Sequence, residues 1–348
     1  MNLASKIQKF HYSKLHFSLL TLIFAPISVF YLLFILAKNS LYRIGILREN
    51  KAPIKIICVG NLTTGGVGKT PVVIELANYL AGIGEKPAVI SRGYKGKLSK
   101  NKVSVIKGFD SVFIDSPNLS GDEPNLIAKS VHNTAVLVGS DRLKMAQKAE
   151  EIGATVVIMD DGFTNRKLYK DHTLLLFDYE KFTGNSFVLP LGPLREPMCE
   201  IKRADTVLII NKTGKDIFLN ENLIKKLKYK DIDVVNVIPK YAINPKNSEI
   251  LQDGAKVLAF TGIGSPSQFF NFLENKFEVL SKNVYDDHHN YTEQDIKYLV
   301  KNAKEIGAEA LITTAKDYVK IKDLASELDI YILELKIDLN VEGILKWD

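Results

Sequence analysis

Cysteine is scarce in this sequence, and its scarcity excludes some classes of protein. Cys58 and Cys199 are the only two cysteines among 348 residues. Two residues so far apart form neither a disulfide framework nor the closely spaced ligand pairs of a zinc site. Cys58 lies within an apolar run, where a small buried side chain is expected. We therefore expect a protein of a reducing compartment.

Acidic residues are almost absent from the first 55 positions. This segment carries eight Lys or Arg side chains against a single acid, Glu49, and the formal net charge of the whole chain is +6. The basic character therefore belongs to the N-terminal segment. A general nucleic-acid-binding protein more often spreads its basic patch over the folded domain. We expect no nucleic-acid partner, and no sequence feature implies an obligate protein partner.

Charged residues are missing altogether between Lys14 and Lys38. As one helix, residues 15–37 span about 34 Å at ~1.5 Å per residue, which is enough to cross a bilayer. Pro26 near the middle would instead bend or break the helix, giving a kinked helix or a hairpin in the membrane interface. A buried core helix is the alternative. A cleaved signal peptide is disfavoured because no small-residue cleavage site follows.

Basic residues flank this apolar stretch, and they would attract anionic lipid head groups. Those that follow it include Arg43, Arg48 and Lys51, and such charges favour the cytoplasmic side of a membrane. We therefore predict that residues 15–37 associate with a membrane surface and that the following residues are cytoplasmic. Whether the segment spans the bilayer or lies in the interface stays open.

A glycine-rich loop follows the apolar residues 54–59 and precedes apolar residues at helical spacing. A strand, a loop and a helix that opens with Gly68-Lys69-Thr70 form the layout of a phosphate-binding loop. Its glycines let backbone N–H groups approach phosphate oxygens, and the helix dipole adds to the attraction. Lys69 is expected to reach the β- and γ-phosphates and the Thr70 hydroxyl to bind Mg²⁺. An ordinary turn before a helix is the alternative.

The predicted nucleotide-binding residues are Thr63, Gly65, Gly66, Val67, Gly68, Lys69 and Thr70. Thr63 departs from the general pattern, which has glycine at that position. Gly65 and Gly66 supply flexibility within the loop instead.

Apolar runs alternate with helical segments along most of the chain. This alternation predicts an α/β fold, with a parallel sheet covered on both faces. Residues 155–159 form one such strand and end at Asp160 and Asp161. Phosphate-loop proteins place a second magnesium-binding acid at such a position. Which of the two acids faces the metal stays open, and a pair of turn acids before Gly162 is the alternative.

Domain boundaries are harder to place. We predict an N-terminal membrane-associated segment at 1–50, a phosphate-loop core at 51–200 and a second, smaller α/β lobe at 201–348. Within the core, residues 189–197 are rich in proline and glycine and predict a stiff rim loop that displays Arg195 and Glu196. In the second lobe, Lys316 follows a predicted strand, which places it near a nucleotide.

Taken in order, these clusters resemble the tetraacyldisaccharide 4′-kinase family, the lipid A 4′-kinases of Gram-negative bacteria. The resemblance runs from the N-terminal apolar segment to near the end of the chain. Thr63 belongs to this family's version of the loop. The residues that carry the resemblance are Gly60-Asn61-Leu62-Thr63, Gly65-Gly66-Val67-Gly68-Lys69-Thr70-Pro71, Ser91-Arg92-Gly93-Tyr94, Gly121-Asp122-Glu123-Pro124, Asp141-Arg142, Asp160-Asp161-Gly162-Phe163, Leu189 to Pro197, Asp287-His288-His289, Thr313-Thr314 and Lys316-Asp317.

The resemblance implies a reaction and a set of roles. The family transfers the γ-phosphate of ATP, with Mg²⁺, to the 4′-hydroxyl of a tetraacylated disaccharide 1-phosphate at the cytoplasmic face of the inner membrane. Asp122 matches the acid that activates the hydroxyl, supported by His288, with Lys69 on the phosphates. Asp160 and Asp161 match the metal site. Substrate or phosphate contacts fall on Arg92, Tyr94, Arg142, Arg195 and Glu196.

Two other functions compete. A phosphate-loop ATPase or GTPase that acts in targeting or metallocentre assembly carries a similar Gly-Gly-Val-Gly-Lys-Thr loop. A membrane-tethered binding module without catalysis is the second. Asp160 and Asp161 beside the loop argue against the module, and the settings of Asp122 and Arg195 argue against the hydrolase.

Overall fold

The computed structural model describes residues 7, 10–12, 19–110, 113–214, 217, 219, 227, 231–264, 266–286, 289–322, 324 and 327–345. The described residues fall into two compact units. Those within 1–210, 218–235 and 339–348 form the first unit, and those within 211–217 and 236–338 form the second. The division therefore lies beyond the predicted boundary near residue 200, and the chain returns to the first unit after residue 338.

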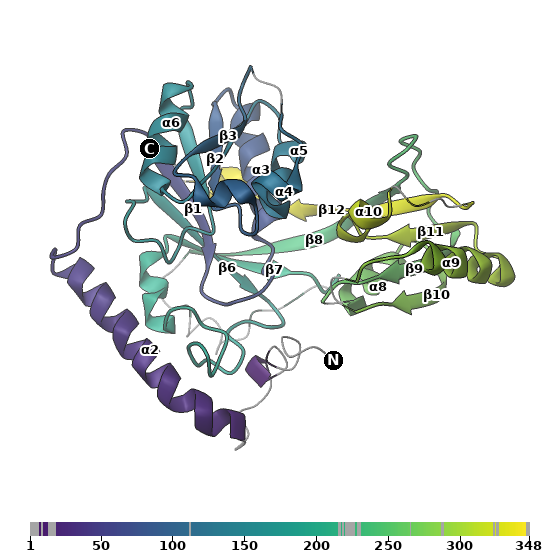
Figure 1. Ribbon diagram of the computed structural model, residues 1–348, viewed down its shortest axis with the longest axis horizontal. Coiled ribbons are helices and arrows are strands. Elements are labelled where there is room, and N and C mark those ends of the chain that lie inside the picture. Colours follow the sequence, from purple (N-terminus) through teal and green to yellow (C-terminus); the bar gives the residue numbers. More distant parts are fainter. Residues whose placement is uncertain are drawn as a thin grey trace. The chain divides into compact units, whose positions relative to one another are not determined.

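A sheet of seven strands forms the centre of the first unit (Figure 1). Its order is β7-β6-β1-β5-β2-β4-β3. All neighbouring pairs described are parallel except β3 with β4, which is antiparallel. The strands are β1 (Lys55–Asn61), β2 (Pro87–Ser91), β3 (Ser104–Lys107), β4 (Ala135–Val138), β5 (Val156–Asp160), β6 (His172–Asp178) and β7 (Thr206–Asn211).

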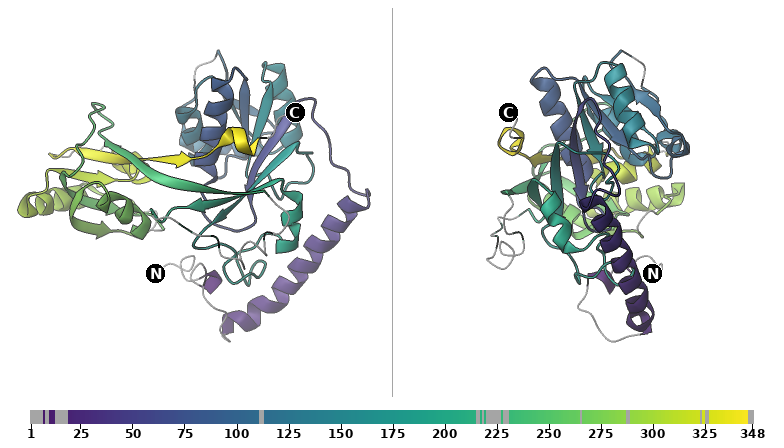
Figure 2. Two further views of the ribbon diagram at one scale, coloured as in Figure 1. Left: turned by 180° about the vertical axis from the view of Figure 1, so that it is seen from behind. Right: turned by 90° about the vertical axis from the view of Figure 1, so that its left-hand side faces the viewer.

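Helices cover both faces of this sheet (Figure 2), as the buried apolar runs predict. Successive residues of a strand point to opposite faces. Ile56, Ile90 and Met159 pack with the apolar side of α6 (Arg142–Glu151), whereas α3 (Lys69–Gly82) also packs on β1, β2 and β5. The remaining helical segments of the unit are α2 (Leu19–Arg43), α4 (Pro117–Ser120), α5 (Asp122–Ser130), α11 (Val341–Ile344), η1 (Lys97–Lys100) and η2 (Met198–Arg203).

The second unit is also α/β, as predicted. Its strands follow the order β10-β9-β11-β12-β8, and the neighbouring pairs described are parallel except β12 with β8, which is antiparallel. Its helix α9 (Glu293–Ile306) begins with a capping box between Thr292 and Asp295. The other elements are α8 (Pro266–Glu274), α10 (Ala315–Ile321), β8 (Asp231–Ile243), β9 (Lys256–Thr261), β10 (Glu278–Val284), β11 (Ala310–Thr313) and β12 (Ile330–Asp338). Residues 231–235 of β8 belong to the first unit.

The N-terminal apolar segment forms one helix, α2, which continues through Pro26 (Figures 1 and 2). The alternative of a helical hairpin is therefore wrong. The helix ends at Arg43 rather than Ala37, and residues 15–18 of the predicted segment lie outside the described residues. Its residues 21–43 are long and apolar enough to cross a membrane.

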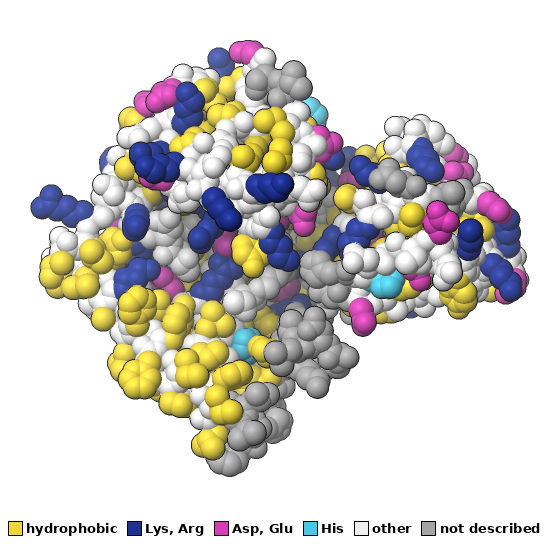
Figure 3. Space-filling view, in the orientation of Figure 1, with side chains coloured by type: hydrophobic (Ala, Val, Ile, Leu, Met, Phe, Trp, Pro, Cys, Tyr) yellow, Lys and Arg dark blue, Asp and Glu magenta, His cyan; other side chains and the backbone are white. Residues whose placement is uncertain are grey.

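Helix α2 buries the polar side chains of Ser28 and Asn39 together with Ile35, and exposes most of its large apolar side chains. Ser28 and Asn39 are buried against the first unit, whereas Phe30 is 73% and Phe34 65% exposed. Hydrophobic side chains gather over this helix in the space-filling view (Figure 3). This is the reverse of the pattern of a helix at a water-exposed surface, where the apolar face packs inward.

Glycine is required at the end of β1. A Cβ atom on Gly60 would lie 2.6 Å from Phe163 Cβ and 2.8 Å from the Phe163 backbone nitrogen. The turn after β5 thus packs directly against the backbone of β1, and this contact holds the Asp160-Asp161 turn beside the phosphate loop.

We expect Gly60→Ala to lower the free energy of unfolding by about 1–3 kcal/mol, the usual cost of overpacking a core. Urea unfolding monitored by circular dichroism measures the change. Gly82→Ala is the matched control, because a Cβ there meets no atom within 4 Å. Equal stability of the two variants would contradict this packing.

Candidate active site

Two glycines shape the phosphate loop. Gly65 and Gly68 have φ values of 106° and 107°, a region that other residues avoid. Gly68 is the N-cap of α3, and no side chain caps the helix there. The first N–H groups of α3 are therefore open to an anion, which the helix dipole also favours.

Lys69, the first residue of α3, is held on two sides. Its ammonium donates to Asn61 Oδ1 at 3.1 Å and lies 3.6 Å from Asp161 Oδ1. Asn61 is buried at the end of β1, and its amide nitrogen donates to the Thr63 carbonyl at 2.6 Å. Asn61 thus fixes both the lysine and the loop. Asn61 belongs to the motif of the loop, but the sequence pattern predicts no role for it.

Asp160 is buried at the end of β5. Its Oδ2 accepts a hydrogen bond from Ser91 at 3.0 Å, since β2 and β5 are neighbours. Its Oδ1 is buried and has no hydrogen-bond partner among the described residues. Burial, with the charge of Glu123, raises the pKa of Asp160 to about 6. A buried carboxylate oxygen without a donor suits a cation.

Asp161 has a different environment one residue later. Its backbone adopts a left-handed φ of 52°, which turns its side chain away from that of Asp160. Both carboxylate oxygens accept from Arg195 Nη1 at 2.9 Å. Although burial opposes the shift, Lys69 and Arg195 hold the pKa of Asp161 below its usual value. Asp161 is therefore ionised and bound by cations of the chain itself.

Arg142 adds a third positive charge near this pair of acids. It is buried at the start of α6, where its guanidinium donates to the Gly139 carbonyl at 3.3 Å. Burial lowers its pKa, and the charges of Asp160 and Asp161 oppose that effect. The structure thus gathers Lys69, Arg142, Arg195 and both acids at one edge of the sheet.

Close backbone packing brings together Arg92, Tyr94 and Asp122, the residues predicted to serve the sugar substrate. A Cβ on Gly93 would lie 2.6 Å from the Ser120 carbonyl oxygen, and one on Gly121 would lie 2.8 Å from the Tyr94 carbonyl oxygen. The loop with Arg92 and Tyr94 therefore packs on the turn that begins α5 at Asp122. All three of these side chains are exposed.

The prediction that Glu196 is displayed on a rim loop is wrong. Its side chain is 1% exposed and forms an ion pair with Arg203. Arg203 also pairs with Glu200 at 2.9 Å and stacks 4.3 Å from the Phe163 ring centroid. The carboxylate faces inward because the buried guanidinium, whose pKa burial lowers to about 10, needs a counter-charge.

Two predicted residues do not belong to the described part of the first unit. Lys316 is exposed on α10 of the second unit. His288 lies outside the described residues. Their roles stay predictions.

A magnesium ion fits the residues present. Among the described residues, no group of three or more His, Cys, Asp or Glu side chains could hold a metal. Magnesium in nucleotide sites usually takes one or two carboxylates, with phosphates and water in the other positions. The orphaned Asp160 Oδ1 and the Thr70 hydroxyl supply such a set.

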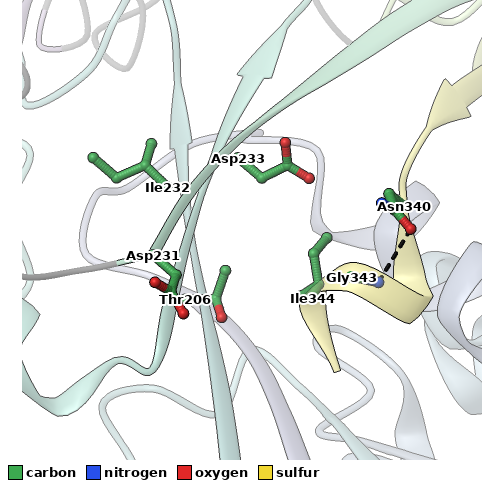
Figure 4. A pocket seen from close by; sticks show the side chains of 7 residues that line it. All are labelled: Thr206, Asp231, Ile232, Asp233, Asn340, Gly343 and Ile344. Atoms are coloured by element: carbon green, nitrogen blue, oxygen red, sulfur yellow. Dashed lines mark hydrogen bonds between the residues drawn. The ribbon is translucent and has the colours of Figure 1, made fainter. Parts of the chain in front are cut away.

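A pocket of about 230 Å³ lies apart from these residues, within the first unit (Figure 4). It shares no residue with the predicted site. It is lined by Thr206, Asp231, Ile232, Asp233, Asn340, Gly343 and Ile344.

The two neighbouring acids should titrate far apart in metal-free protein. We expect Asp160 to titrate near pH 6 and Asp161 below its usual pKa of about 3.8. Above pH 6 Asp160 is therefore mostly ionised, and at pH 5 a proton occupies it. Carboxyl ¹³C NMR, assigned with Asp160→Asn and Asp161→Asn, measures both values. A common midpoint near pH 4 would contradict the difference in environment.

Comparisons with known proteins agree on one family. The model of the family described as Tetraacyldisaccharide-1-P 4'-kinase matches residues 20–346. The tetraacyldisaccharide 4'-kinase of Syntrophus aciditrophicus is 37% identical over 331 residues, covering 90% of this chain and 88% of the relative. That of Desulfotalea psychrophila is 36% identical, covering 88% and 89%.

A solved structure gives the same answer. The crystal structure of LpxK from Aquifex aeolicus in complex with ATP matches with a TM-score of 0.69 and 29% identity. The match covers 92% of this chain and 96% of that one. The chain belongs to the tetraacyldisaccharide-1-P 4'-kinase family.

Proposed function

We propose that this protein transfers the γ-phosphate of ATP to the 4′-hydroxyl of a tetraacyldisaccharide 1-phosphate in lipid A biosynthesis. The family and its named relatives support the reaction, and the A. aeolicus neighbour is in complex with ATP. The observation that carries the proposal is the cluster of Lys69, Arg195, Asp160 and Asp161 beside the open N-terminus of α3.

The donor side of the reaction requires positioning and charge neutralisation. The N–H groups of the loop and of α3 would hold the phosphates, and Lys69 would exchange Asp161 for the γ-phosphate. Mg²⁺, held by Asp160 and the Thr70 hydroxyl, would neutralise phosphate charge. The orphaned Oδ1 of Asp160 favours this acid as the direct ligand. Asp161, with both oxygens on Arg195, would keep that arginine in place.

The acceptor side would use Asp122 as the base. An exposed carboxylate at the start of α5 can accept the proton of the sugar hydroxyl as the new bond forms. His288 would orient this carboxylate, and Arg92 and Tyr94, beside Asp122 through the packing of Gly93 and Gly121, would contact the substrate. Lys316 would contact the nucleotide.

We propose that α2 lies along a membrane rather than across it. The Ser28 hydroxyl donates to the Val188 carbonyl at 2.8 Å, and the Tyr31 hydroxyl to the Arg195 carbonyl at 2.8 Å. Farther along, Arg43 pairs with Glu200. Ser28 to Arg43 covers about 22 Å of helix at ~1.5 Å per residue. A spanning helix cannot carry the polar body of the protein along that length, because the bilayer core offers no water.

The outer face of α2 suits the lipid side of such an arrangement. Phe30, Leu33 and Phe34 are each more than half exposed. They would enter the acyl layer, while Lys and Arg side chains nearby attract anionic head groups. Because the reaction consumes ATP, the surface would be the cytoplasmic face of the inner membrane. The substrate's acyl chains would stay in the same bilayer.

A transfer assay tests the reaction. Protein in detergent receives labelled ATP, Mg²⁺ and the lipid disaccharide 1-phosphate, and the lipid and free phosphate are separated by chromatography. We expect label on the lipid. Asp122→Asn should lower the rate about 10²–10⁴-fold, the usual contribution of a general base. The exposed Asp110→Asn is the control. Label found only in free phosphate would support the hydrolase instead. A wild-type rate for Asp122→Asn would exclude Asp122 as the base.

Vesicle flotation tests the membrane surface. We expect Phe30→Ser, Leu33→Ser and Phe34→Ser together to weaken binding to phosphatidylglycerol-containing vesicles at least about tenfold, because each buried apolar side chain contributes ~1.5–3 kcal/mol. The control is Ile250→Ser with Val319→Ser, which removes exposed apolar side chains of the second unit. Full flotation of the triple variant would exclude this face as the anchor.

A further inference from the structure

The N-terminal segment contacts the phosphate loop directly. The Tyr12 hydroxyl donates to the Thr64 carbonyl at 2.9 Å. It lies 3.9 Å from where a Cβ on Gly65 would stand. Burial, with the charge of Asp178, raises the pKa of Tyr12, so that the phenol stays protonated and able to donate. A residue that precedes α2 in the chain therefore holds the backbone of the loop.

The position of Tyr12 is itself fixed. The neighbouring His11 is buried, its Nε2 is 2.8 Å from the Pro190 carbonyl, and its own carbonyl accepts from the Asn185 N–H at 2.9 Å. Gly184 permits this approach, since a Cβ there would lie 2.6 Å from the His11 carbonyl oxygen and 3.0 Å from the Tyr12 ring. These contacts of His11 and Gly184 fix the position of Tyr12 on the first unit.

A second tyrosine of the segment holds the other side of the site. Tyr31 donates to the Arg195 carbonyl, while the Arg195 N–H donates to the Leu62 carbonyl at 2.7 Å. The backbone of Arg195 is therefore fixed at both its polar groups. This leaves the guanidinium to contact both oxygens of Asp161.

The two loops that the tyrosines contact form one structure. The Thr64 N–H donates to the Pro193 carbonyl at 2.8 Å, and Thr63 forms an antiparallel bridge with Leu194. A displacement of one loop therefore displaces the other. Tyr12 and Tyr31 contact this pair at separate points.

Peptide geometry explains what Tyr12 contributes. In a trans peptide the carbonyl and the following N–H point in opposite directions. When Tyr12 binds the Thr64 carbonyl, the Gly65 N–H is directed to the other side of the loop. Without that bond, the peptide between Thr64 and Gly65 can rotate, because glycine adopts positive φ freely. The rotation turns the Thr64 carbonyl oxygen toward the phosphates.

We propose that Tyr12 and Tyr31 are positioning residues of the phosphate site, so that the N-terminal segment completes the site as well as contacting the membrane. Tyr12 orients the loop for ATP, and Tyr31 holds Arg195 on Asp161. The inference rests on the proposed assignment of residues 63–70 to the phosphates. It adds two residues that neither the motif nor the predicted roles contain.

The test uses full-length protein in detergent with Tyr12→Phe and Tyr31→Phe, each of which removes one hydroxyl. We expect Tyr12→Phe to raise the KM and Kd for ATP about three- to tenfold, the effect of one lost hydrogen bond, with kcat within about twofold. Tyr31→Phe should lower kcat by a similar factor with little change in KM. Isothermal titration calorimetry and initial rates measure these values.

Tyr42→Phe is the matched control. Tyr42 lies on α2, as Tyr31 does. Its ring centroid is 4.7 Å from Cζ of Arg166, away from both loops. It should retain wild-type kinetics. Melting temperature and vesicle flotation should be unchanged in all three variants. Kinetic losses that follow only a fall in melting temperature, or that Tyr42→Phe shares, would overturn the proposal, as would wild-type kinetics in both tyrosine variants.

Lys69→Ala separates this inference from its basis. If Lys69→Ala binds ATP as tightly as the wild type, the assignment of the phosphate site fails and the tyrosine proposal fails with it. If Lys69→Ala loses ATP while Tyr12→Phe and Tyr31→Phe behave as the wild type, the phosphate site stands and only the positioning roles are wrong.

Discussion

The contact between Asp161 and two cations is the interaction on which the site depends. Lys69 comes from the start of α3, Arg195 from the loop before η2, and Asp161 from the turn after β5. Three separate segments are thus joined by one carboxylate. With Arg142 the site gathers three cations around the two acids Asp160 and Asp161. Such an edge attracts a polyanion with its metal ion.

The environments of the two acids explain why adjacent aspartates can have different tasks. Asp160 lies in the strand register, where burial leaves one oxygen without a donor. Asp161 leaves the strand with positive φ and meets cations at the rim. The sequence predicts both acids at this place. It does not predict that their environments differ, because the difference depends on the backbone conformation at Asp161.

Local patterns predicted much of the first unit. The strand before the loop, the helix after it and the acids after β5 follow from apolar runs, glycine and the order of elements. Long-range contacts were not predictable in this way. The inward position of Glu196 depends on Arg203 and Phe163, and the return of residues 339–345 to the first unit depends on contacts that no local pattern records.

The apolar segment shows the same limit. Its composition predicts a lipid-facing helix, and Pro26 suggested a break. The helix continues instead, so that Ser28, Tyr31 and Asn39 share one face one or two turns apart. Only the hydrogen bonds of Ser28 and Tyr31 and the ion pair of Arg43 favour an interfacial helix over a spanning one. An interfacial helix and a spanning helix can have the same amino-acid composition.

In the proposed membrane arrangement, the exposed apolar face of α2 would link the substrate to the site. A lipid acceptor keeps its acyl chains in the bilayer, so its sugar can meet ATP only at a fixed height above the membrane. Hydrogen bonds from the inner face of α2 and from Tyr12 end on the loops that hold Lys69 and Arg195 in place. In the proposed arrangement, the same polypeptide segment would set both the height of the site above the membrane and the geometry of its phosphate loop. An anchor joined only by a flexible linker would set neither, since a random coil fixes no distance between its ends.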